Sequence, residues 1–508
     1  MSKRLFPYLS LLIIFIFAAV CGTEEKQLGR QVSERLIAKL DVFPPIKDSI
    51  RVSPDGRRVA YLSEKKGFLG LGGVKWFAVI DGKEEKKYDI IGRNSLIFSP
   101  DSKRIAYVAL SGKEMFAVVD GKEEKHYEWI GNPKLEIHRD LPSLETGPPV
   151  FSPDSKHLAY VANEKGLKGS FVVVDGKKEK HYDWIGNREN KKDGKIGPLT
   201  FSLDSNQIAY VAQKGEKVFV VLNGNEVNQY DEAKLLTFSP DSKHVAYAVK
   251  EGNKWSVILD GKRGKQYDEL GAPIFSPDSQ HLAYSAREGK ELFVVLDGEE
   301  GKHYEGGISH PVFSPDSKHI AYAAVKDKKG FIISDGKEGK QYDIAVKEER
   351  GKRRYFFSIP KFSPDSSRLA YLAYIEGRWL VVLDGKEGKQ YDDISEDSLV
   401  FSPDSKRIAY MAFVGKKKLV VLDGKEGKQY DFFLEKAFTF SPDSTHFVYG
   451  ANTENKSFII VDGEEGKPYD LIITKGPKTI FFDSPNSFHY FAIGDKDNAI
   501  YLVEETIK

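Results

Sequence analysis

A basic and aromatic segment, residues 347–357, is the clearest candidate for molecular recognition in this chain of 508 residues. It joins cationic side chains to an aromatic one: Arg350, Lys352, Arg353, Arg354 and Tyr355. Guanidinium groups bind carboxylate and phosphate oxygens in pairs, and cations are attracted to aromatic faces. The segment therefore predicts a site for an acidic protein patch, a sugar acid or a lipid head group. The same residues also allow a solvated loop whose aromatic side chains fold back on the protein.

Two further polar segments, residues 132–149 and 187–197, carry the other candidate binding residues. These residues are His138, Arg139, Arg188, Lys191 and Lys192. Like the first segment, both interrupt an otherwise regular pattern. We assign all three to one binding surface for the reason given below.

The remaining histidines and aspartates do not predict a metal site. Two sets of histidines each recur at one position of a repeated unit: His157, His244, His281, His319 and His446, and His126, His181 and His303. Repetition of this kind is expected from duplication of a surface position. Asp101 and its equivalents could ring a calcium ion, but an aspartate in a turn usually accepts hydrogen bonds from its own backbone. We expect no metal, no cofactor and no catalytic residue.

One unit of about 40 residues accounts for nearly all of the chain after residue 46. Its landmark is Phe-Ser-Pro-Asp-Ser, followed by Ala-Tyr and then by Asp-Gly-Lys and Tyr-Asp. The first serine of the landmark recurs at Ser53, Ser99, Ser152, Ser202, Ser239, Ser276, Ser314, Ser363, Ser402 and Ser441. An eroded copy follows at 481–492. Such a period is typical of β-propellers and solenoids.

Each part of the unit predicts a turn or a strand. Ser-Pro-Asp-Ser suits a type I turn, because proline has the φ that the second turn position needs. Asp-Gly predicts a second hairpin. Apolar runs such as residues 171–174 predict strands buried on both faces, so each sheet must lie between two neighbours. Four short strands per unit, joined by hairpins, predict an all-β fold of propeller blades.

By these motifs the chain resembles the WD-like propeller repeats of the TolB and tricorn type, over residues 46–508. The resemblance implies a propeller and a role as a binding platform, and it implies no particular reaction. We find no G-x-S-x-G nucleophile elbow that would point to a hydrolase.

The chain has about eleven copies of the unit, which is more than the roughly four to eight blades of an ordinary ring. We therefore expect two rings in tandem, with one oversized ring or an open spiral as alternatives. The last copy ends after its third predicted strand, and an apolar stretch at residues 36–43 precedes the first copy. We expect this stretch, within a linker of residues 21–45, to add the missing outer strand to the last blade and so protect an unpaired edge.

The repeats vary at one end of the predicted blades. The Ser-Pro-Asp turns and Asp-Gly hairpins fall at the other end. Phe275 follows Tyr267 by 8 residues, whereas the equivalent crossings take 24 residues in Tyr127–Phe151 and 20 in Tyr342–Phe362. The three segments described first all lie in such crossings. Insertions gathered on one face often mark a binding face.

Residues 1–20 have the order of a secretory signal peptide. Lys3 and Arg4 precede an apolar stretch that runs from Leu5 to Val20, and polar residues follow from Glu24. The stretch is shorter than the ~20 residues of a membrane-spanning helix. We therefore expect export to the periplasm or cell surface.

Cys21, the only cysteine, lies where the apolar stretch ends. Its surroundings resemble the lipobox of bacterial lipoproteins, in which the cysteine carries the lipid. Val20 and Ala18 depart from the residues that this family prefers, so lipidation of Cys21 and ordinary cleavage after Gly22 both stay open. A single cysteine cannot form an internal disulfide or a cysteine-based zinc site.

The charge balance restricts the partners. Lys and Arg total 76 and Asp and Glu total 75, for a net charge of +1. Binding to nucleic acid or to an anionic membrane surface needs a basic excess, so we expect neither, and membrane contact only through a lipid on Cys21.

The sequence as a whole predicts an exported, non-catalytic β-propeller that binds a protein or glycan of the cell envelope. Two alternatives stay open. One is a hydrolase or lyase that acts on a polysaccharide or phosphate ester in a channel lined by the residues before each Phe-Ser. The other is a purely structural component of a surface layer.

Overall fold

The computed structural model describes residues 29–508, except 41–43, 47, 67–72, 132–147, 187–196, 350–351, 357, 454–455 and 495–496. These residues form an all-β structure with one short 3-10 turn, η2 (Glu396–Ser398). Across the same part of the chain, no helix has the length and apolar character needed to cross a membrane.

Four kinds of strand recur, numbered here from the inner edge of each sheet outward. The first, innermost strands are β2 (Arg51–Val52), β6 (Ile90–Ile91), β7 (Ile97–Phe98), β11 (Trp129–Ile130), β12 (Val150–Phe151), β16 (Trp184–Ile185), β17 (Thr200–Phe201), β21 (Glu232–Phe238), β25 (Glu269–Leu270), β26 (Ile274–Phe275), β30 (Gly307–Ile308), β31 (Val312–Phe313), β38 (Lys361–Phe362), β42 (Asp393–Ile394), β43 (Val400–Phe401), β47 (Phe432–Phe440), β51 (Leu471–Ile472) and β52 (Phe481–Ser484).

The second strands are β3 (Val59–Lys66), β8 (Ile105–Ser111), β13 (Leu158–Asn163), β18 (Ile208–Lys214), β22 (Val245–Glu251), β27 (Leu282–Glu288), β32 (Ile320–Lys326), β39 (Leu369–Ile375), β44 (Ile408–Val414), β48 (Phe447–Asn452) and β53 (Ser487–Ile493). The third strands are β4 (Val74–Ile80), β9 (Glu114–Val119), β14 (Ser170–Val174), β19 (Lys217–Leu222), β23 (Lys254–Leu259), β28 (Glu291–Leu296), β33 (Lys329–Ser334), β40 (Arg378–Leu383), β45 (Lys417–Leu422), β49 (Ser457–Val461) and β54 (Ala499–Ile507).

The fourth, outer strands are β5 (Lys83–Glu84), β10 (Lys122–Glu123), β15 (Lys177–Tyr182), β20 (Asn225–Tyr230), β24 (Lys262–Tyr267), β29 (Glu299–Glu300), β34 (Lys337–Glu338), β41 (Lys386–Glu387), β46 (Lys425–Tyr430), β50 (Glu464–Glu465) and β1 (Arg30–Lys39). Strand β35 (Tyr342–Asp343) pairs both with β33 of its own repeat and with β39 of the next, and so joins two sheets. One further hairpin, β36 (Ala345–Glu349) and β37 (Lys352–Phe356), stands apart from these sheets.

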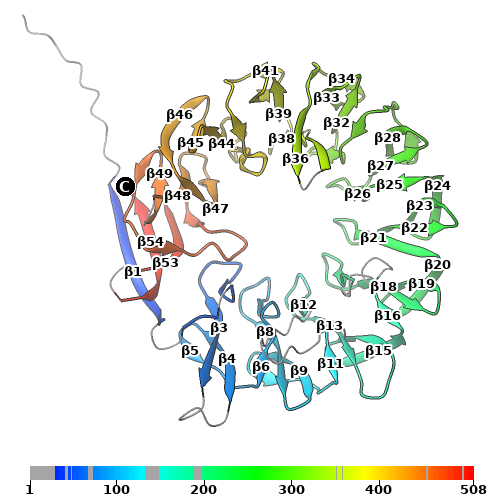
Figure 1. Cartoon of the computed structure of the whole chain (residues 1–508), viewed down its shortest axis with the longest axis vertical. Coiled ribbons are helices and arrows are strands. Elements are labelled where there is room, and N and C mark those ends of the chain that lie inside the picture. The colour runs from blue at the N-terminus through cyan, green and yellow to red at the C-terminus, as the bar shows by residue number, and fades with distance from the viewer. Residues whose placement is uncertain are drawn as a thin grey trace, which may run out of the picture.

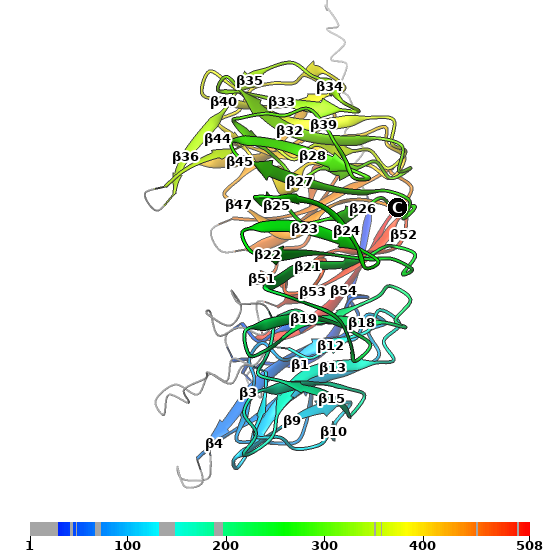
Figure 2. The same cartoon turned by 90° about the vertical axis from the view of Figure 1, so that its right-hand side faces the viewer.

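The sheets are antiparallel and follow one another around a ring. Within the described residues, nine sheets have four or five strands, and a sheet of ten strands spans two consecutive repeats. Figure 1 shows them in chain order around a central opening, and Figure 2 shows the ring from the side. The chain is therefore a β-propeller.

The ring is single, so the expectation of two rings in tandem is wrong. At nine of the interfaces between described sheets, a tyrosine in or just after the outer strand packs against a tyrosine of the following second strand. Tyr88 and Tyr107 meet edge to face at 6.4 Å, and Tyr469 and Tyr490, at the end of the chain, do so at 6.0 Å. A constant interface gives a constant rotation per repeat, and the ring closes where these rotations complete a turn. Interface geometry, not the usual number of blades, thus determines the size of the ring.

Strand β1 closes the ring by pairing antiparallel with β54, from Arg30 opposite Ile507 to Lys39 opposite Ala499. It spans residues 30–39, whereas the sequence suggested residues 36–43. The last sheet therefore takes its outer strand from the beginning of the chain, and β54 has no free edge.

The apolar core is divided among the interfaces between sheets. One cluster joins Leu62 and Trp76 of one sheet to Tyr107 and Phe116 of the next. Small alanines on the second strands, such as Ala60 and Ala109, let the sheets approach closely. Each sheet is buried on both faces, as the apolar runs predicted.

Candidate binding site

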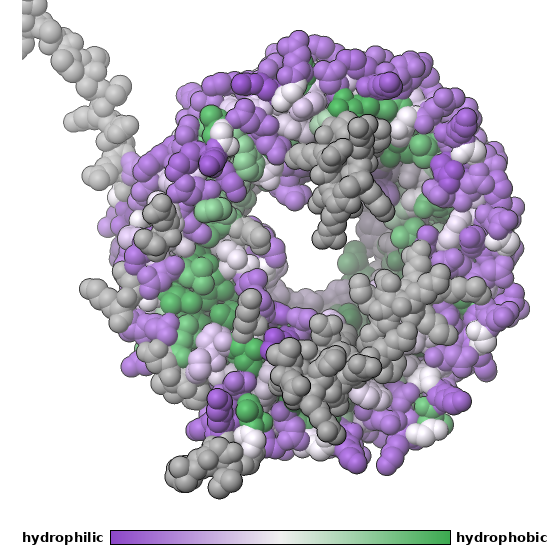
Figure 3. Space-filling model, viewed as in Figure 1, coloured by the Kyte–Doolittle hydropathy of each residue, from purple (hydrophilic) through white to green (hydrophobic). Residues whose placement is uncertain are grey.

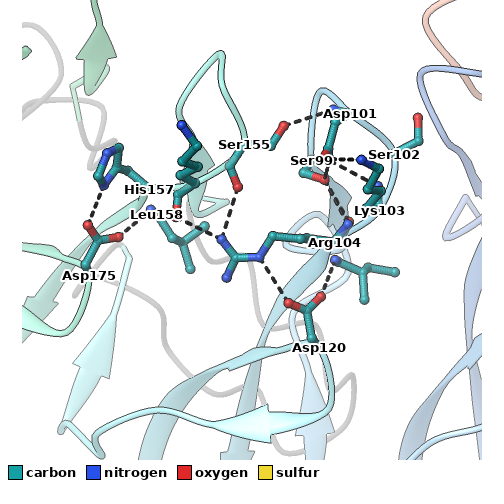
Figure 4. A network of polar contacts seen from close by, with 12 residues as sticks. Ser99, Asp101, Ser102, Lys103, Arg104, Asp120, Ser155, His157, Leu158 and Asp175 are labelled. Atoms are coloured by element: carbon teal, nitrogen blue, oxygen red, sulfur yellow. Dashed lines mark hydrogen bonds and ion pairs between the residues drawn. The ribbon is translucent and has the colours of Figure 1, made fainter. Parts of the chain in front are cut away.

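The Ser-Pro-Asp-Ser turns tie neighbouring sheets together on one face of the ring, which we call the regular face. The Ser99 hydroxyl donates to Asp101 Oδ1 at 2.6 Å, and the Asp101 backbone N–H donates to Ser155 Oγ of the next turn at 2.9 Å (Figure 4). The same bond between turns recurs in Asp55–Ser102, Asp154–Ser205, Asp204–Ser242, Asp241–Ser279, Asp278–Ser317, Asp316–Ser366, Asp365–Ser405 and Asp404–Ser444. The turn aspartates therefore have a structural role.

The residue just before each second strand also binds across this face. Arg104 Nε donates to Asp120 Oδ2 at 3.0 Å, and its Nη1 donates to the Ser155 carbonyl of the next sheet at 3.1 Å. Where this residue is histidine, its Nδ1 lies 2.6–2.8 Å from the equivalent hairpin aspartate: His157–Asp175, His244–Asp260, His281–Asp297, His319–Asp335 and His446–Asp462. These histidines thus orient the aspartates of the Asp-Gly hairpins.

Lysine–glutamate pairs link the outer strands of neighbouring sheets. Lys302 Nζ donates to Glu338 at 2.5 Å, and the Tyr304 hydroxyl donates to the same carboxylate at 3.0 Å. Equivalent ion pairs are Lys86–Glu123, Lys180–Glu226, Lys265–Glu300, Lys340–Glu387, Lys389–Glu426, Lys428–Glu465 and Lys467–Glu34. Charges of the repeated motif are matched between neighbours, which accounts for the near balance of the whole chain. Among the described residues, no group of three or more His, Cys, Asp or Glu side chains is placed to hold a metal ion.

The opposite face, which we call the decorated face, carries the hairpin of β36 and β37. It lies in the crossing between β35 and β38, as the insertion pattern predicted. Figure 2 shows β36 projecting beyond this face, and in Figure 1 the hairpin points toward the central opening. Four of the predicted binding residues, Lys352, Arg353, Arg354 and Tyr355, therefore belong to a β-strand that stands out from the ring.

The register of this hairpin distributes its charges unevenly. Glu348 lies opposite Arg353, and Glu349 lies opposite Lys352, whereas Arg354 lies opposite Lys347. The paired strands therefore carry four cationic positions, 347, 352, 353 and 354, against two acidic ones, 348 and 349.

The other predicted site residues lie outside the described residues. They are Arg350, His138 and Arg139, Arg188, Lys191 and Lys192, and the lipidation candidate Cys21. The strands that precede the crossings with the loop residues, β11 and β16, pair with the ends of the second strands β13 and β18, and β35 pairs in the same way with the end of β39.

The positions before each Phe-Ser, which the enzyme alternative requires, hold few ionisable groups. They are Ile97, Val150, Thr200, Thr237, Ile274, Val312, Val400 and Thr439, with Arg51 and Lys361. Arg51 donates to the Asp48 carbonyl at 2.8 Å, and Lys361 donates to the Leu399 carbonyl at 3.0 Å. This set offers no pair of carboxylates for general acid–base catalysis.

No family model matches the chain, and no curated protein is similar to it in sequence. Among solved structures, it is similar to the β-propeller domain of the Trilobed protease from Pyrococcus furiosus, with 14% identity, a TM-score of 0.28, and 57% of this chain and 96% of that chain covered. It is also similar to TolB from Acinetobacter baumannii, with 13% identity, a TM-score of 0.23, and 62% of this chain and 82% of that chain covered. A third similar structure is that of a eukaryotic initiation factor, with 14% identity, a TM-score of 0.38, and 78% of this chain and 94% of that chain covered. The fold assignment depends on the strand order of the chain itself.

The sequence analysis did not identify a set of exposed apolar residues at the rim of the decorated face. Phe432 and Leu471, which begin β47 and β51, expose 60% and 45% of their surface. Lys418 Nζ lies 5.3 Å from the centre of the Phe432 ring. Apolar side chains also gather on this face over the last sheet, near β53 (Figure 3). Other copies have glutamate at this repeat position, for example Glu232 and Glu269. A position-by-position comparison of the copies could therefore have revealed these apolar residues.

Proposed function

We propose that this chain is an exported, non-catalytic β-propeller that binds a protein or glycan of the bacterial cell envelope through its decorated face. One observation carries the proposal. The charged residues of the regular face and outer edge bind neighbouring sheets, whereas the β36–β37 hairpin projects from the ring with an excess of cationic positions. A partner with an acidic surface, either carboxylate-rich protein or acidic glycan, complements such a hairpin.

Export is supported by the order of residues 1–20, and Cys21 is the candidate point of lipid attachment. Mass measurement of the processed chain tests this part. A chain that begins at a lipid-modified Cys21 is a membrane-anchored lipoprotein, and an unmodified chain that begins at Thr23 is a released one. Retention of residues 1–20 contradicts export.

The binding part is tested by affinity capture from an envelope extract. The wild type is compared with a chain in which residues 347–357 are replaced by Gly and Ser, and with the double variant Arg353→Glu, Arg354→Glu. Lys416→Glu is the matched control, because Lys416 is an exposed cation on another loop of the same face. We expect both hairpin variants to lose the captured partner and the control to retain it.

Treatment of the extract with protease or glycosidase distinguishes a protein from a glycan. Identical capture by all four chains overturns the assignment of the site.

A further inference from the structure

The regular face contains open clefts between neighbouring sheets. One cleft of about 510 Å³ lies between β23–β24 and β27, with apolar walls that include Leu259 and Phe275 and with Tyr284 among its lining residues. An equivalent cleft of about 410 Å³ contains Tyr449. Both volumes fall within the range of small-molecule sites, roughly 300–1,000 Å³.

Both clefts have a glycine at the same repeat position, Gly264 in the first cleft and Gly427 in the second. Glycine also occupies this position in other copies, as at Gly301 and Gly388, so its absence of a side chain is one contribution to the opening. A third equivalent cleft, in which the same position is Val227, has a volume of only about 230 Å³. A Cβ on Gly264 would lie 3.7 Å from the Tyr284 hydroxyl. The missing side chain thus leaves a path from solvent to that hydroxyl.

Three other copies fill this position with a carboxylate: Glu85, Glu124 and Glu179. Glu179 accepts a hydrogen bond of 2.5 Å from the hydroxyl of Tyr210, which is the equivalent of Tyr284. The carboxylates of Glu124 and Glu179 also lie against Gly176 and Gly224, the hairpin glycines that correspond to Gly298 in the open cleft. At Glu179, therefore, a carboxylate occupies the space that is open beside Gly264 and accepts a hydrogen bond from the tyrosine. In the copies with Glu85 and Glu124, the hydroxyls of Tyr107 and Tyr160 have no hydrogen-bond partner among the described residues.

Tyr284 is a donor without an acceptor. Only 4% of its surface is exposed, and its hydroxyl makes no hydrogen bond to any residue that the structure describes. Burial raises the pKa of Tyr284 to about 12, so the hydroxyl stays protonated at neutral pH. A carboxylate that enters the cleft can accept a hydrogen bond from this hydroxyl.

The charges around the cleft are compatible with an anion. Lys262 and Arg263 lie at its rim. Asp260 and Asp297 are each bound by a histidine Nδ1 and by a backbone N–H. In the copy with Glu124, the equivalent aspartates are Asp120 and Asp175. Aspartates at these two positions are therefore compatible with a carboxylate between them.

We propose that the clefts at Gly264–Tyr284 and Gly427–Tyr449 bind a small ligand through a carboxylate that takes the place of the Glu179 side chain. The apolar walls suit a ring or short carbon chain attached to that carboxylate. Sugar acids and acidic amino-acid derivatives both have this chemistry. The clefts lie on the face opposite the β36–β37 hairpin, so this inference is independent of the proposed function.

The proposal is tested by ligand-observed NMR titration of the exported chain with D-glucuronate, N-acetyl-L-glutamate and D-glucose. We expect at least one carboxylate to bind at least tenfold more tightly than glucose, and the preferred acid identifies the source of the carboxylate. The double variant Gly264→Glu, Gly427→Glu reproduces the filled copies and should abolish binding. Tyr284→Phe with Tyr449→Phe should weaken binding about fivefold, whereas Tyr210→Phe should leave it unchanged. The reciprocal change Glu179→Gly should add a binding site.

Three results would overturn the proposal: neither acid binds, glucose binds as tightly as the acids, or the Gly→Glu double variant binds as the wild type does. Circular dichroism and the thermal midpoint show that each variant is folded. The chain with residues 347–357 replaced should retain the acid. Failure of acid binding therefore says nothing against capture of a partner by the hairpin, and failure of capture says nothing against the clefts.

Discussion

The hydroxyl of Tyr469 donates a hydrogen bond of 2.5 Å to the carboxylate of Glu34, across the junction that closes the ring. Lys467 donates to the same carboxylate at 2.7 Å. Tyr304 and Lys302 bind Glu338 in the same way within the ring. Strand β1 therefore takes the place of an ordinary outer strand, although it comes from the opposite end of the chain.

Replacement of Glu34 by Ala should lower the free energy of unfolding by about 1–2 kcal/mol, because the buried Tyr469 hydroxyl loses its acceptor. Amide hydrogen exchange should also accelerate in β1, which contacts the ring at its seam. Glu338→Ala is the matched control, with a similar loss of stability and unchanged exchange in β1. Unaltered exchange of β1 in Glu34→Ala would show that this bond does not hold the seam.

A buried ion pair secures the same strand. Arg30 Nε donates to Glu505 Oε2 at 2.8 Å, and the two side chains are 8% and 0% exposed. Glu505→Ala should destabilise the chain by about 3–5 kcal/mol, since it leaves a buried guanidinium unpaired. Glu505 also accepts a hydrogen bond of 2.6 Å from the buried Tyr490 hydroxyl, so the compensating variant must remove that hydroxyl as well. The triple variant Arg30→Met, Glu505→Leu, Tyr490→Phe should recover most of this loss in chemical denaturation. A loss in the triple variant as large as that in Glu505→Ala would indicate that the charges themselves stabilise the seam.

The first turn departs from the repeat for a steric reason. Gly56, at φ +70°, occupies the position where other copies have serines at φ values of 63–68°, such as Ser102 and Ser155. A Cβ at Gly56 would lie 2.3 Å from the Phe481 ring. Gly56→Ser should therefore lower the thermal midpoint, by the equivalent of about 1–3 kcal/mol of overpacking.

The cause of that loss can be separated from backbone strain, because serine adopts this φ elsewhere in the ring. In a Phe481→Ala background, addition of Gly56→Ser should cost little or nothing. An equal cost in both backgrounds would refute the steric explanation.

Acid should weaken the ring through the turn aspartates. Hydrogen bonds from the Ser239 hydroxyl and the Lys243 backbone N–H lower the pKa of Asp241 to about 2, and the pKa values of Asp101 and Asp278 are also lowered. Because the folded pKa lies below the unfolded value of 3.8, this stabilisation is complete above about pH 4 and is lost as the pH falls toward 2. The thermal midpoint measured from pH 6 to pH 2 should fall most steeply in this interval.

Asp241→Asn provides the check on that mechanism. It should be less stable than the parent at pH 6, and the difference should shrink toward pH 2, where the parent aspartate is itself protonated. Asp397→Asn, at an exposed position in η2, serves as the control with no effect. A constant difference across the pH range would contradict the assigned role of Asp241.

The local structure was predictable because it depends on residues close together in the chain. Proline and serine in the turn at Ser99, and the glycine after Asp120, select tight turns wherever they occur. The apolar run at residues 171–174 predicted a strand buried on both faces, and the long crossing after Tyr342 predicted an element on the variable face. Because the same motif recurs in every copy, each of these predictions was better supported than it would be from a single copy.

The sequence alone determined the blade, its turns and the face that varies. Only the tertiary structure decided the number of rings, the exact strand that closes the seam, and which repeat positions form clefts. Ring size depends on a rotation summed over every interface, and Glu34 and Tyr469 meet although they are 435 residues apart. The effect of Gly264 or Glu179 depends on a tyrosine of the neighbouring sheet. Such relationships arise from packing between sheets, which local sequence patterns do not encode.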